Sequence, residues 1–399
     1  MFKFIHTSDW HLGQNFYGYD RGMEQQDFLQ QLTSIVRKHQ PDALLVSGDI
    51  YHTAAPSSAA VSMYVESMLN IHNACPTMKI IVIAGNHDSA SRLECDSRLW
   101  QLANLTVLGG IGRNDEGLAD LDRHIIRVGD KGMVAAVPYA YPTSFPLTSS
   151  EPIESDKRQQ AYFQALLDRV DAINTAGLPV VLMAHLAVNN SDFTGHDRNM
   201  TMECVEIENL GNGYDYAALG HIHRPQDVSM RARYCGTPIA VSFDEQCEHS
   251  VSIVELDTHG AMPRVGTKRI KNIKPLHTIP AKEPVTLDNA LEELSRCNDV
   301  EEAYIRLNVL VDRYLPSGAQ ERAAQAVSEK KGRFCEIKKT TSTAANSIIR
   351  QMTVEEFNSK SPLEVANQFF IDDTGSPMNE QEKTMFNQVY QMVIEENRL

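Results

Sequence analysis

The sequence predicts an α/β protein that carries a small α+β unit and a helical C-terminal tail. Two observations predict this fold class. Short apolar runs of strand length alternate with helix-like stretches through the first half of the chain. After a basic stretch, Arg264–Lys274, the pattern changes to short strands and helices, and residues 350–399 contain helix starts but no strand signal.

The composition is that of a globular protein: of 399 residues, 42% are hydrophobic and 22% are charged. The longest apolar runs, 79–84 and 179–184, are far shorter than the ~20 residues of a membrane span. The N-terminal run stops at His6, too early for a signal-peptide core. The 7 cysteines are scattered and form no C-x-x-C pair, so we expect reduced thiols in a cytoplasmic protein without membrane contact.

The elements of the first half follow from apolar runs and helical periodicity. We expect buried strands at Phe2–His6, Ala43–Ser47, Lys79–Ala84, Met133–Val137, Pro179–Ala184 and Tyr216–Leu219. We expect helices between them at Glu24–His39, Ala59–Asn73 and Asp156–Thr175. In such folds, ligands bind just beyond the strand ends.

We expect three domains, at residues 1–270, 271–342 and 343–399. In the second, a strand near residue 276 is followed by a helix (287–297), a strand (303–311), a helix (318–329) and a strand (333–340). The third begins with a linker rich in Thr, Ser, Ala and Asn. Its helix starts are capping boxes at 353–356, 361–364 and 379–382, followed by apolar stripes that must either fold back or bind a partner.

Residues that can bind metal follow five of the apolar runs. They are Asp9-Trp10-His11, Gly48-Asp49, Gly85-Asn86-His87-Asp88, His185 and Gly220-His221-Ile222-His223. Oxygen and imidazole donors without cysteine favour Mn²⁺, Fe or Zn over a thiolate site. Two such cations, ~3.5–4 Å apart, can stabilise in-line displacement at a phosphoryl group. We expect the glycines of these motifs to let the backbone approach the site closely.

This ordered set of motifs resembles the calcineurin-like metallophosphoesterase family. The resemblance implies a two-sheet sandwich flanked by helices that binds two divalent metal ions. It implies that Asp49 bridges both ions and that His87 donates a proton to the leaving oxygen, oriented by Asp88. One ion would also be held by Asp9, His11 and His223, and the other by Asn86, His185 and His221.

Longer strings narrow the resemblance within this family. After Gly48-Asp49 the chain lacks the Asp-Arg-Gly continuation typical of Ser/Thr protein phosphatases, whereas 6–17 and 218–224 resemble the SbcD-type bacterial nucleases. That resemblance implies a Mn²⁺-dependent 3′→5′ exonuclease and endonuclease that processes DNA double-strand breaks, acting on DNA ends, hairpins and single strands. It implies a homodimer, a DNA-gripping cap at 271–342, and an SMC-like ATPase partner of the SbcC type, bound through residues 350–399.

Two alternatives remain open. A small-molecule metallophosphoesterase, such as a nucleotidase or cyclic-nucleotide phosphodiesterase, would share the motifs but would need neither cap nor tail. A non-catalytic scaffold of the same fold would not need a complete ligand set and His87. The chain has no G-x-x-x-x-G-K-[ST] phosphate loop, so any ATP dependence must come from a partner.

DNA-contact residues are predicted from charge and from position beside the expected site. The net charge of −15 argues against indiscriminate nucleic-acid binding, but phosphate contacts depend on local patches. Solvated faces and loop packing are the competing interpretations of these residues. The candidates are Lys268, Arg269, Lys271, Lys338 and Lys339 in two basic patches, His52 as a substrate contact, and Trp10, Phe16 and Tyr17, whose rings could stack on unpaired bases.

Overall fold

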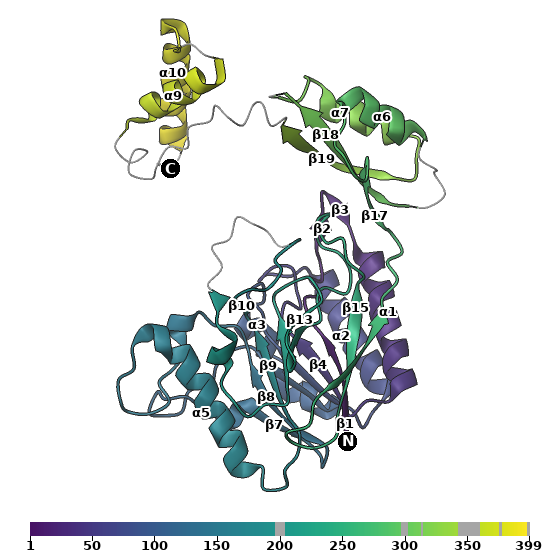
Figure 1. The fold of residues 1–399 in the computed structure, drawn as a ribbon, viewed down its shortest axis with the longest axis vertical. Coiled ribbons are helices and arrows are strands. Elements are labelled where there is room, and N and C mark those ends of the chain that lie inside the picture. Colours follow the sequence, from purple (N-terminus) through teal and green to yellow (C-terminus); the bar gives the residue numbers. More distant parts are fainter. Residues whose placement is uncertain (196–203, 297–301, 313, 342–359, 375–376, 397–399) are drawn as a thin grey trace. The chain divides into compact units, whose positions relative to one another are not determined.

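The structure is a computed structural model that describes residues 1–195, 204–296, 302–312, 314–341, 360–374 and 377–396 (Figure 1). The chain forms two compact units. The first comprises Met1–Thr278, Asp299–Arg306 and Lys330–Glu336, and the second comprises Ile279–Asn298, Leu307–Glu329 and Ile337–Leu399. The three-domain division at residues 270 and 342 stays a prediction.

The first sheet of the larger unit has the strand order β16-β15-β1-β4-β5-β6. Neighbouring pairs from β1 to β6 are parallel, whereas β15 and β16 extend the sheet in antiparallel fashion. The strands are β1 (Phe2–Thr7), β4 (Ala43–Ser47), β5 (Lys79–Ile83), β6 (Leu105–Leu108), β15 (Ser250–Leu256) and β16 (Arg264–Arg269).

The second sheet has the strand order β13-β14-β12-β9-β8-β7. Its central strands β8, β9, β12 and β14 pair in parallel, and the edge strands β7 and β13 are antiparallel to their neighbours. The strands are β7 (Ile125–Val128), β8 (Gly132–Val137), β9 (Val180–His185), β12 (Tyr216–Gly220), β13 (Gln226–Ser229) and β14 (Ala232–Tyr234).

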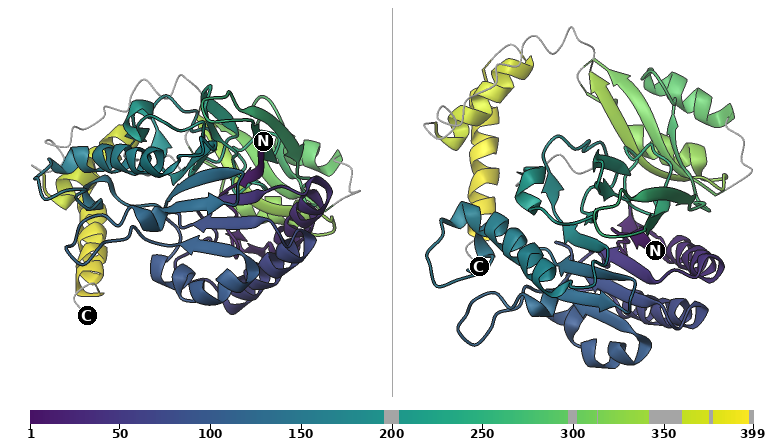
Figure 2. Two further views of the ribbon diagram at one scale, coloured as in Figure 1. Left: turned by 90° about the horizontal axis from the view of Figure 1, so that it is seen from below. Right: turned by 60° about the horizontal axis from the view of Figure 1, so that its bottom comes forward.

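Three apolar clusters hold this sandwich together. Between the sheets, side chains of β1, β4 and β5 pack against those of β8, β9 and β12. Helices α1 (Gly22–His39) and α2 (Ser58–Ala74) cover the outer face of the first sheet, and α5 (Arg158–Ile173) covers that of the second (Figure 2). The α2 helix begins after Ser57, whose hydroxyl accepts a hydrogen bond from the amide of Ala60.

Shorter elements connect these layers. They are the hairpin β2 (Asn15–Phe16) and β3 (Tyr19–Asp20), the pair β10 (Ala187–Val188) and β11 (Cys204–Val205), helices α3 (Ala90–Glu94) and α4 (Ser97–Trp100), and the 3-10 turns η1 (Gln101–Ala103), η2 (Asp122–His124), η3 (Pro142–Ser144), η4 (Ser155–Lys157) and η5 (Ile207–Leu210).

The rest of the described chain contains a third sheet and four helices. The sheet has the order β17-β18-β19, with β17 (Leu276–Ile279), β18 (Tyr304–Val311) and β19 (Arg333–Thr341). The helices are α6 (Leu287–Arg296), α7 (Ala319–Val327), α9 (Pro362–Thr374) and α10 (Glu380–Glu396). The strand–helix–strand–helix–strand pattern expected from the sequence is therefore confirmed.

The two C-terminal helices begin at the predicted capping boxes. The amide of Ser361 donates to Glu364 Oε2 at 2.7 Å, and the amide of Glu364 donates to the Ser361 hydroxyl at 3.3 Å. Asn379 and Glu382 exchange the same pair of contacts at 2.7 and 3.0 Å. The box at 353–356 lies outside the described residues. Among the described helices, none combines the length and apolar character that crossing a bilayer requires.

Candidate metal centre

The predicted metal ligands meet at the carboxyl ends of five parallel strands. Asp9 and His11 follow β1, Asp49 follows β4, and Asn86 follows β5, all in the first sheet. The second sheet contributes His185 at the end of β9, with His221 and His223 after β12. The sandwich therefore places both sheet edges around one cluster, which we call the ligand cluster.

Within this cluster, Asp9, His11 and His223 form a first group whose ligand atoms all lie within 4.8 Å of one another. The Nε2 atoms of His11 and His223 are 3.3 Å apart. His223 Nδ1 lies 3.1 Å from Glu245 Oε1, and a carboxylate there accepts the Nδ1 proton. His223 Nε2 is then the ring atom that faces His11.

A second group consists of Asp49, His185 and His221, also within 4.8 Å of one another. The Asn86 Oδ1 atom lies 3.0 Å from His185 Nε2 and 2.9 Å from His221 Nδ1. His185 Nδ1 donates to the carbonyl of Ser47 at 2.8 Å, so Nε2 is the ring atom that faces the Asn86 oxygen. Without its proton, this Nε2 atom and the Asn86 oxygen could both bind a cation.

Asp49 belongs to the second group and also lies close to the first. Its Oδ2 is 3.5 Å from His185 Nε2 in the second group and 3.8 Å from His11 Nε2 in the first. Its Oδ1 accepts the backbone amide of His87 at 2.9 Å. A carboxylate in this position can contact two cations at once.

The donor set therefore fits a pair of divalent metal ions. The donors are carboxylate, imidazole and amide groups, which suit Mn²⁺, Fe or Zn. His11 Nδ1 is buried and has no hydrogen-bond partner among the described residues. A buried polar atom of this kind is costly unless something else satisfies it.

The pKa shifts of the buried groups also favour a cation in this cluster. Burial lowers the pKa of His185, but the Asp49 carboxylate outweighs that effect, and the pKa lies at about 9. Burial raises the pKa of Asp49, but His185 outweighs it and holds that pKa well below its usual range. The buried carboxylate thus favours positive charge beside it, which a bound cation would supply in place of a proton.

Close backbone approach around the cluster depends on glycine, as expected. A Cβ atom on Gly48 would lie 2.2 Å from His185 Nδ1, and one on Gly85 would lie 2.1 Å from Asp49 Oδ1. A Cβ atom on Gly220 would lie 1.8 Å from the carbonyl oxygen of Ser47. All three distances are far below contact distance, so only glycine fits.

Four of the ligands have a strained backbone. The φ angles of Asp9, His11, Asp49 and His221 are 54°, 46°, 51° and 99°, in the left-handed region that non-glycine residues rarely adopt. Such conformations persist only where the surrounding structure enforces them, and they concentrate at functional sites. The surrounding fold therefore holds these side chains in place against backbone strain.

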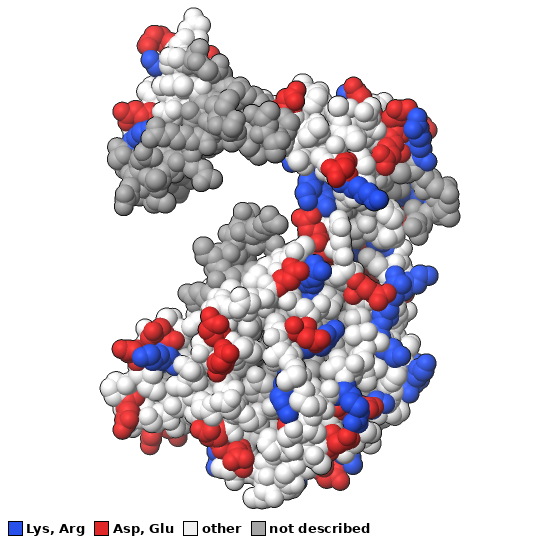
Figure 3. Space-filling view, viewed as in Figure 1, with Lys and Arg blue, Asp and Glu red and all other residues white. Residues whose placement is uncertain are grey.

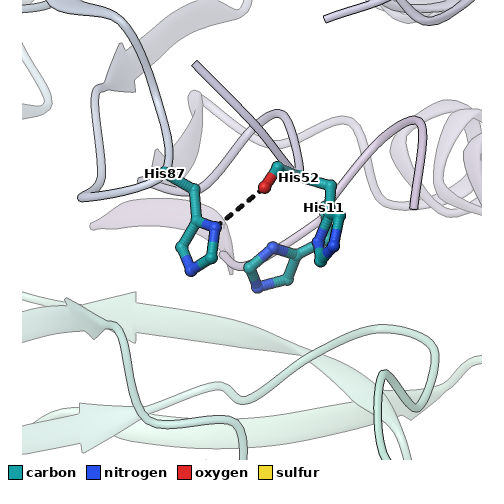
Figure 4. A group of neighbouring side chains, drawn as sticks. All are labelled: His11, His52 and His87. Atoms are coloured by element: carbon teal, nitrogen blue, oxygen red, sulfur yellow. Dashed lines mark hydrogen bonds between the residues drawn. The ribbon is translucent and has the colours of Figure 1, made fainter. Parts of the chain in front are cut away.

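His87 is not a member of the first group, but it lies beside His11 and His52 (Figure 4). Its ring is 4.9 Å from the His11 ring and stacks on that of His52 at 5.8 Å, between centroids. Its Nδ1 donates to the carbonyl oxygen of His52 at 2.8 Å. His11, His52 and His87 also have ligand atoms within 4.8 Å of one another, so they form a third group that could hold a metal ion.

The expected role of Asp88 needs correction. The Asp88 carboxylate accepts the backbone amides of Gly85, Ile50 and Tyr51 at 2.8, 3.1 and 2.9 Å, and the His52 carbonyl is what orients His87. Asp88 ties the loop after β5 to the loop after β4 because it binds amides from both. Its influence on His87 therefore passes through the backbone that carries His52.

The prediction that Trp10 and Phe16 stack on unpaired bases is wrong. Trp10 is fully buried, packs edge-on against Phe28 with ring centroids 5.6 Å apart, and donates from Nε1 to the Thr7 hydroxyl at 3.0 Å. Phe16 is 3% exposed and packs against Phe243 and Tyr304, at 5.3 and 5.1 Å between centroids. Neither ring can reach a nucleic-acid base, because both belong to the protein core.

The remaining DNA-contact candidates are accessible. Tyr17 is 47% exposed, and Lys268, Arg269, Lys271, Lys338 and Lys339 are exposed. Arg269 forms an ion pair with Glu248 at 3.2 Å. Lys274, at the end of the first basic patch, is 4% exposed and pairs with Glu302 at 3.1 Å, so it is no part of a DNA-binding surface. On the face in Figure 3, basic and acidic side chains are interspersed.

Sequence reasoning missed several supporting residues. Glu245 holds His223, and its other oxygen, Oε2, accepts the Thr237 hydroxyl at 2.6 Å. The Ser8 hydroxyl donates to Asp9 Oδ2. Tyr139 packs its ring 6.2 Å from that of His185. Glu245 lies 22 residues from His223 in sequence, and its contact with that ring follows from tertiary packing.

Comparison with known proteins gives two family matches. The Calcineurin-like phosphoesterase family matches residues 2–225, and the family described as Type 5 capsule protein repressor C-terminal domain matches residues 272–374. A solved zebrafish (Danio rerio) structure described as a dimetal phosphatase covers 67% of this chain and 98% of its own, at 14% identity and a TM-score of 0.35, too low to carry an argument.

Full-length relatives are more informative. A Rhodobacter capsulatus protein described as the D-type subunit of the nuclease SbcCD is 32% identical over 311 residues, which cover 74% of this chain and 75% of that protein. A protein with the same description from Escherichia coli K12 is 29% identical over 82% of both chains. Another from Bacillus subtilis is 31% identical over 63% of this chain and 66% of that protein. The chain therefore belongs to the calcineurin-like phosphoesterase family and, within it, to the family of the D-type SbcCD nuclease subunits.

Proposed function

We propose that this protein is the nuclease subunit of an SbcCD-type complex and hydrolyses phosphodiester bonds in DNA with two divalent metal ions, Mn²⁺ by preference. The observation that carries the proposal is the ligand cluster, in which Asp49 lies within reach of both groups of donors. The relatives described as nucleases support DNA as the substrate.

Each residue of the site has a proposed role. Asp9, His11, Asp49 and His223 would hold one ion, and Asp49, Asn86, His185 and His221 would hold the other. When bound, the two cations polarise the phosphodiester group and stabilise the charge that develops in displacement. His87, oriented by the His52 carbonyl, delivers a proton to the leaving oxygen. His52 and Tyr17 contact the substrate.

The substrates and the partner follow from the family resemblance. We propose 3′→5′ exonuclease and endonuclease action on DNA ends, hairpins and single strands, in repair, recombination and replication. The relatives are named as one subunit of a complex, which supports an SMC-like ATPase of the SbcC type as the other. We further propose a cytoplasmic homodimer in which exposed basic side chains, including Lys268 and Lys338, contact DNA.

The C-terminal helices are the proposed docking segment for the ATPase, within residues 350–399. Phe369 on α9 is 58% exposed, and Met385 and Val389 on α10 are 67% and 55% exposed. Large exposed apolar side chains mark interaction surfaces. Truncation at Ala345 should leave Mn²⁺-dependent cleavage of single strands intact and abolish co-purification with the ATPase. Unchanged binding of the ATPase by the truncated chain would refute the docking role.

The decisive experiment compares substrates with one preparation of the protein. Purified protein with Mn²⁺ is incubated with labelled single-strand, hairpin and blunt duplex DNA, in parallel with p-nitrophenyl phosphate and a cyclic nucleotide. We expect cleavage of DNA at rates that exceed turnover of either small molecule. Hydrolysis of the small molecules with intact DNA would instead assign the protein to the small-molecule phosphoesterases.

A further inference from the structure

A cavity opens beside the second group of the ligand cluster. Its volume is about 860 Å³, within the ~300–1,000 Å³ range of pockets that enclose a small organic ligand. Asn86 and His221 of the ligand cluster are among its lining residues, so the cavity adjoins that cluster. All of its lining residues belong to the larger unit.

Two tyrosines form an aromatic side of this cavity. Tyr139 is nearly parallel to the His221 ring, with centroids 6.5 Å apart and an interplanar angle of 29°. Its backbone amide donates to the carbonyl of Ala84 at 2.9 Å, which fixes this segment to the loop after β5. Tyr141 packs edge-on against Tyr139 at 5.6 Å and is 64% exposed. The Tyr141 ring is therefore available to a ligand.

One cation lines the same cavity. The Arg113 guanidinium donates to the carbonyls of Gly117 and Ser144, both at 3.2 Å. Among the described residues, no carboxylate forms an ion pair with Arg113. A guanidinium has five N–H donors, so several remain for a phosphate. The carbonyl contacts hold the group in place without neutralising its charge.

We propose that this cavity binds one unpaired nucleotide of the DNA strand, next to the scissile phosphate, on the side of the second metal-ligand group. The base stacks on Tyr141, and Arg113 contacts a flanking phosphate. The proposal rests on the proposed nuclease function and deepens it. A base can enter the cavity only after it leaves the duplex stack, so the site selects single strands and frayed ends over fully paired ends.

The first test measures binding without cleavage. A single-stranded oligonucleotide that carries 2-aminopurine is titrated in EDTA, where stacking on an aromatic ring quenches the fluorescence of the probe. Tyr141→Ala should weaken binding about 5- to 150-fold, the range provided by one base–aromatic contact, and should remove the quenching. Tyr141→Phe keeps the ring and should bind within about 2-fold of the wild type.

Leu99→Ala is the matched control, because Leu99 is 66% exposed and does not line the cavity. Unchanged binding by Tyr141→Ala, or an equal loss in Leu99→Ala, overturns the stacking contact. A single abasic site moved along the oligonucleotide gives a second criterion. At one position, it should weaken binding to the wild type and erase the difference between wild type and Tyr141→Ala. If no position does so, the base does not occupy this cavity.

Arg113 is tested by salt dependence. Loss of one phosphate contact should reduce the slope of log K against log [salt] by ~0.7 for a single strand. Arg127→Gln is the control, since Arg127 is also exposed and donates to a backbone carbonyl, that of Gly129. An unchanged slope in Arg113→Gln, or the same reduction in Arg127→Gln, contradicts the phosphate contact.

Failure of this inference is distinguishable from failure of the proposed function. If the wild type cleaves DNA with Mn²⁺ but Tyr141→Ala binds the oligonucleotide as tightly as the wild type, only the cavity assignment is wrong. If the wild type hydrolyses bis(p-nitrophenyl) phosphate but leaves DNA intact, the proposed nuclease function is wrong. A wild type that fails to bind single strands overturns the cavity assignment as well.

Discussion

The ligand cluster and the surfaces that flank it are built in different ways. The predicted ligands lie at the ends of parallel strands or within four residues beyond them, where Gly48, Gly85 and Gly220 let the backbone approach the site closely. The flanking aromatic residues lie in loops, where the residue next to a ligand can be buried, as Trp10 is between Asp9 and His11. Position along a strand thus predicts chemistry, whereas proximity in sequence does not predict access to substrate.

The largest effect should come from the ligand shared by both groups. Asp49→Asn replaces the central carboxylate by a neutral amide, which is a poor bridge between cations. We expect metal-dependent hydrolysis of every substrate to fall by far more than the 10–100-fold typical of supporting residues. Cleavage assays with Mn²⁺ measure this, with the exposed Asp130→Asn as a control. More than a few per cent of residual activity would contradict the bridging role.

His87→Gln should separate chemistry from metal binding. The side chain lies beside the first group, and its proposed role is proton donation, so the rate should fall ~10²–10⁴-fold while the metal content stays unchanged. Rate and metal content are measured on the same preparation. If metal is lost in proportion to activity, His87 is a ligand, and the third group in Figure 4 holds an ion.

Gly85→Ala tests whether the backbone approach holds the cluster in place. The new Cβ would lie 2.1 Å from Asp49 Oδ1 and 2.4 Å from the Asp49 amide nitrogen. We expect metal affinity to fall by about 10–100-fold, because Asp49 must move. Gly266→Ala is the control, since its Cβ would meet nothing nearer than 4.0 Å. Equal metal affinity in both variants would show that the contact is not decisive.

Replacing Trp10 or Tyr17 by alanine should affect protein stability to different extents. Trp10→Ala removes a buried ring and should lower the free energy of unfolding by ~3–5 kcal/mol. Tyr17→Ala removes a half-exposed ring and should change it by less than ~1 kcal/mol, with its effect confined to DNA affinity. Urea denaturation and oligonucleotide titration distinguish the two. A stable Trp10→Ala variant that loses only DNA affinity would reverse our correction.

The smallest effect concerns a histidine outside the cluster. Burial lowers the pKa of His124, whose Nε2 accepts the amide of Gly112 and whose Nδ1 donates to the carbonyl of Ala136. Below pH ~6.5 the His124 ring binds a proton in the unfolded state but stays neutral in the folded state. The free energy of unfolding should therefore decrease as the pH is lowered through this range, by up to ~1.4 kcal/mol per pH unit. His124→Gln should reduce that slope. An unchanged slope would exclude His124 as its source.

Most of the fold and the ligand cluster could be predicted from sequence because both follow local rules. Apolar runs such as 79–84 form the strands, and the motifs after them, such as Gly85-Asn86, stand at fixed places on a sheet edge. Glu245 and Tyr139 could not be predicted, because only tertiary packing brings them beside His223 and His185. The same limit explains the misassigned role of Asp88, whose partners are backbone amides from another loop.

Anomalous X-ray diffraction from crystals of the wild type soaked in Mn²⁺ tests the central claim most directly. We predict two manganese peaks ~3.5–4 Å apart, both in contact with Asp49. One should also contact Asp9, His11 and His223, and the other Asn86, His185 and His221. A single peak in the ligand cluster, or a peak among His11, His52 and His87 instead, would contradict a two-ion site bridged by Asp49.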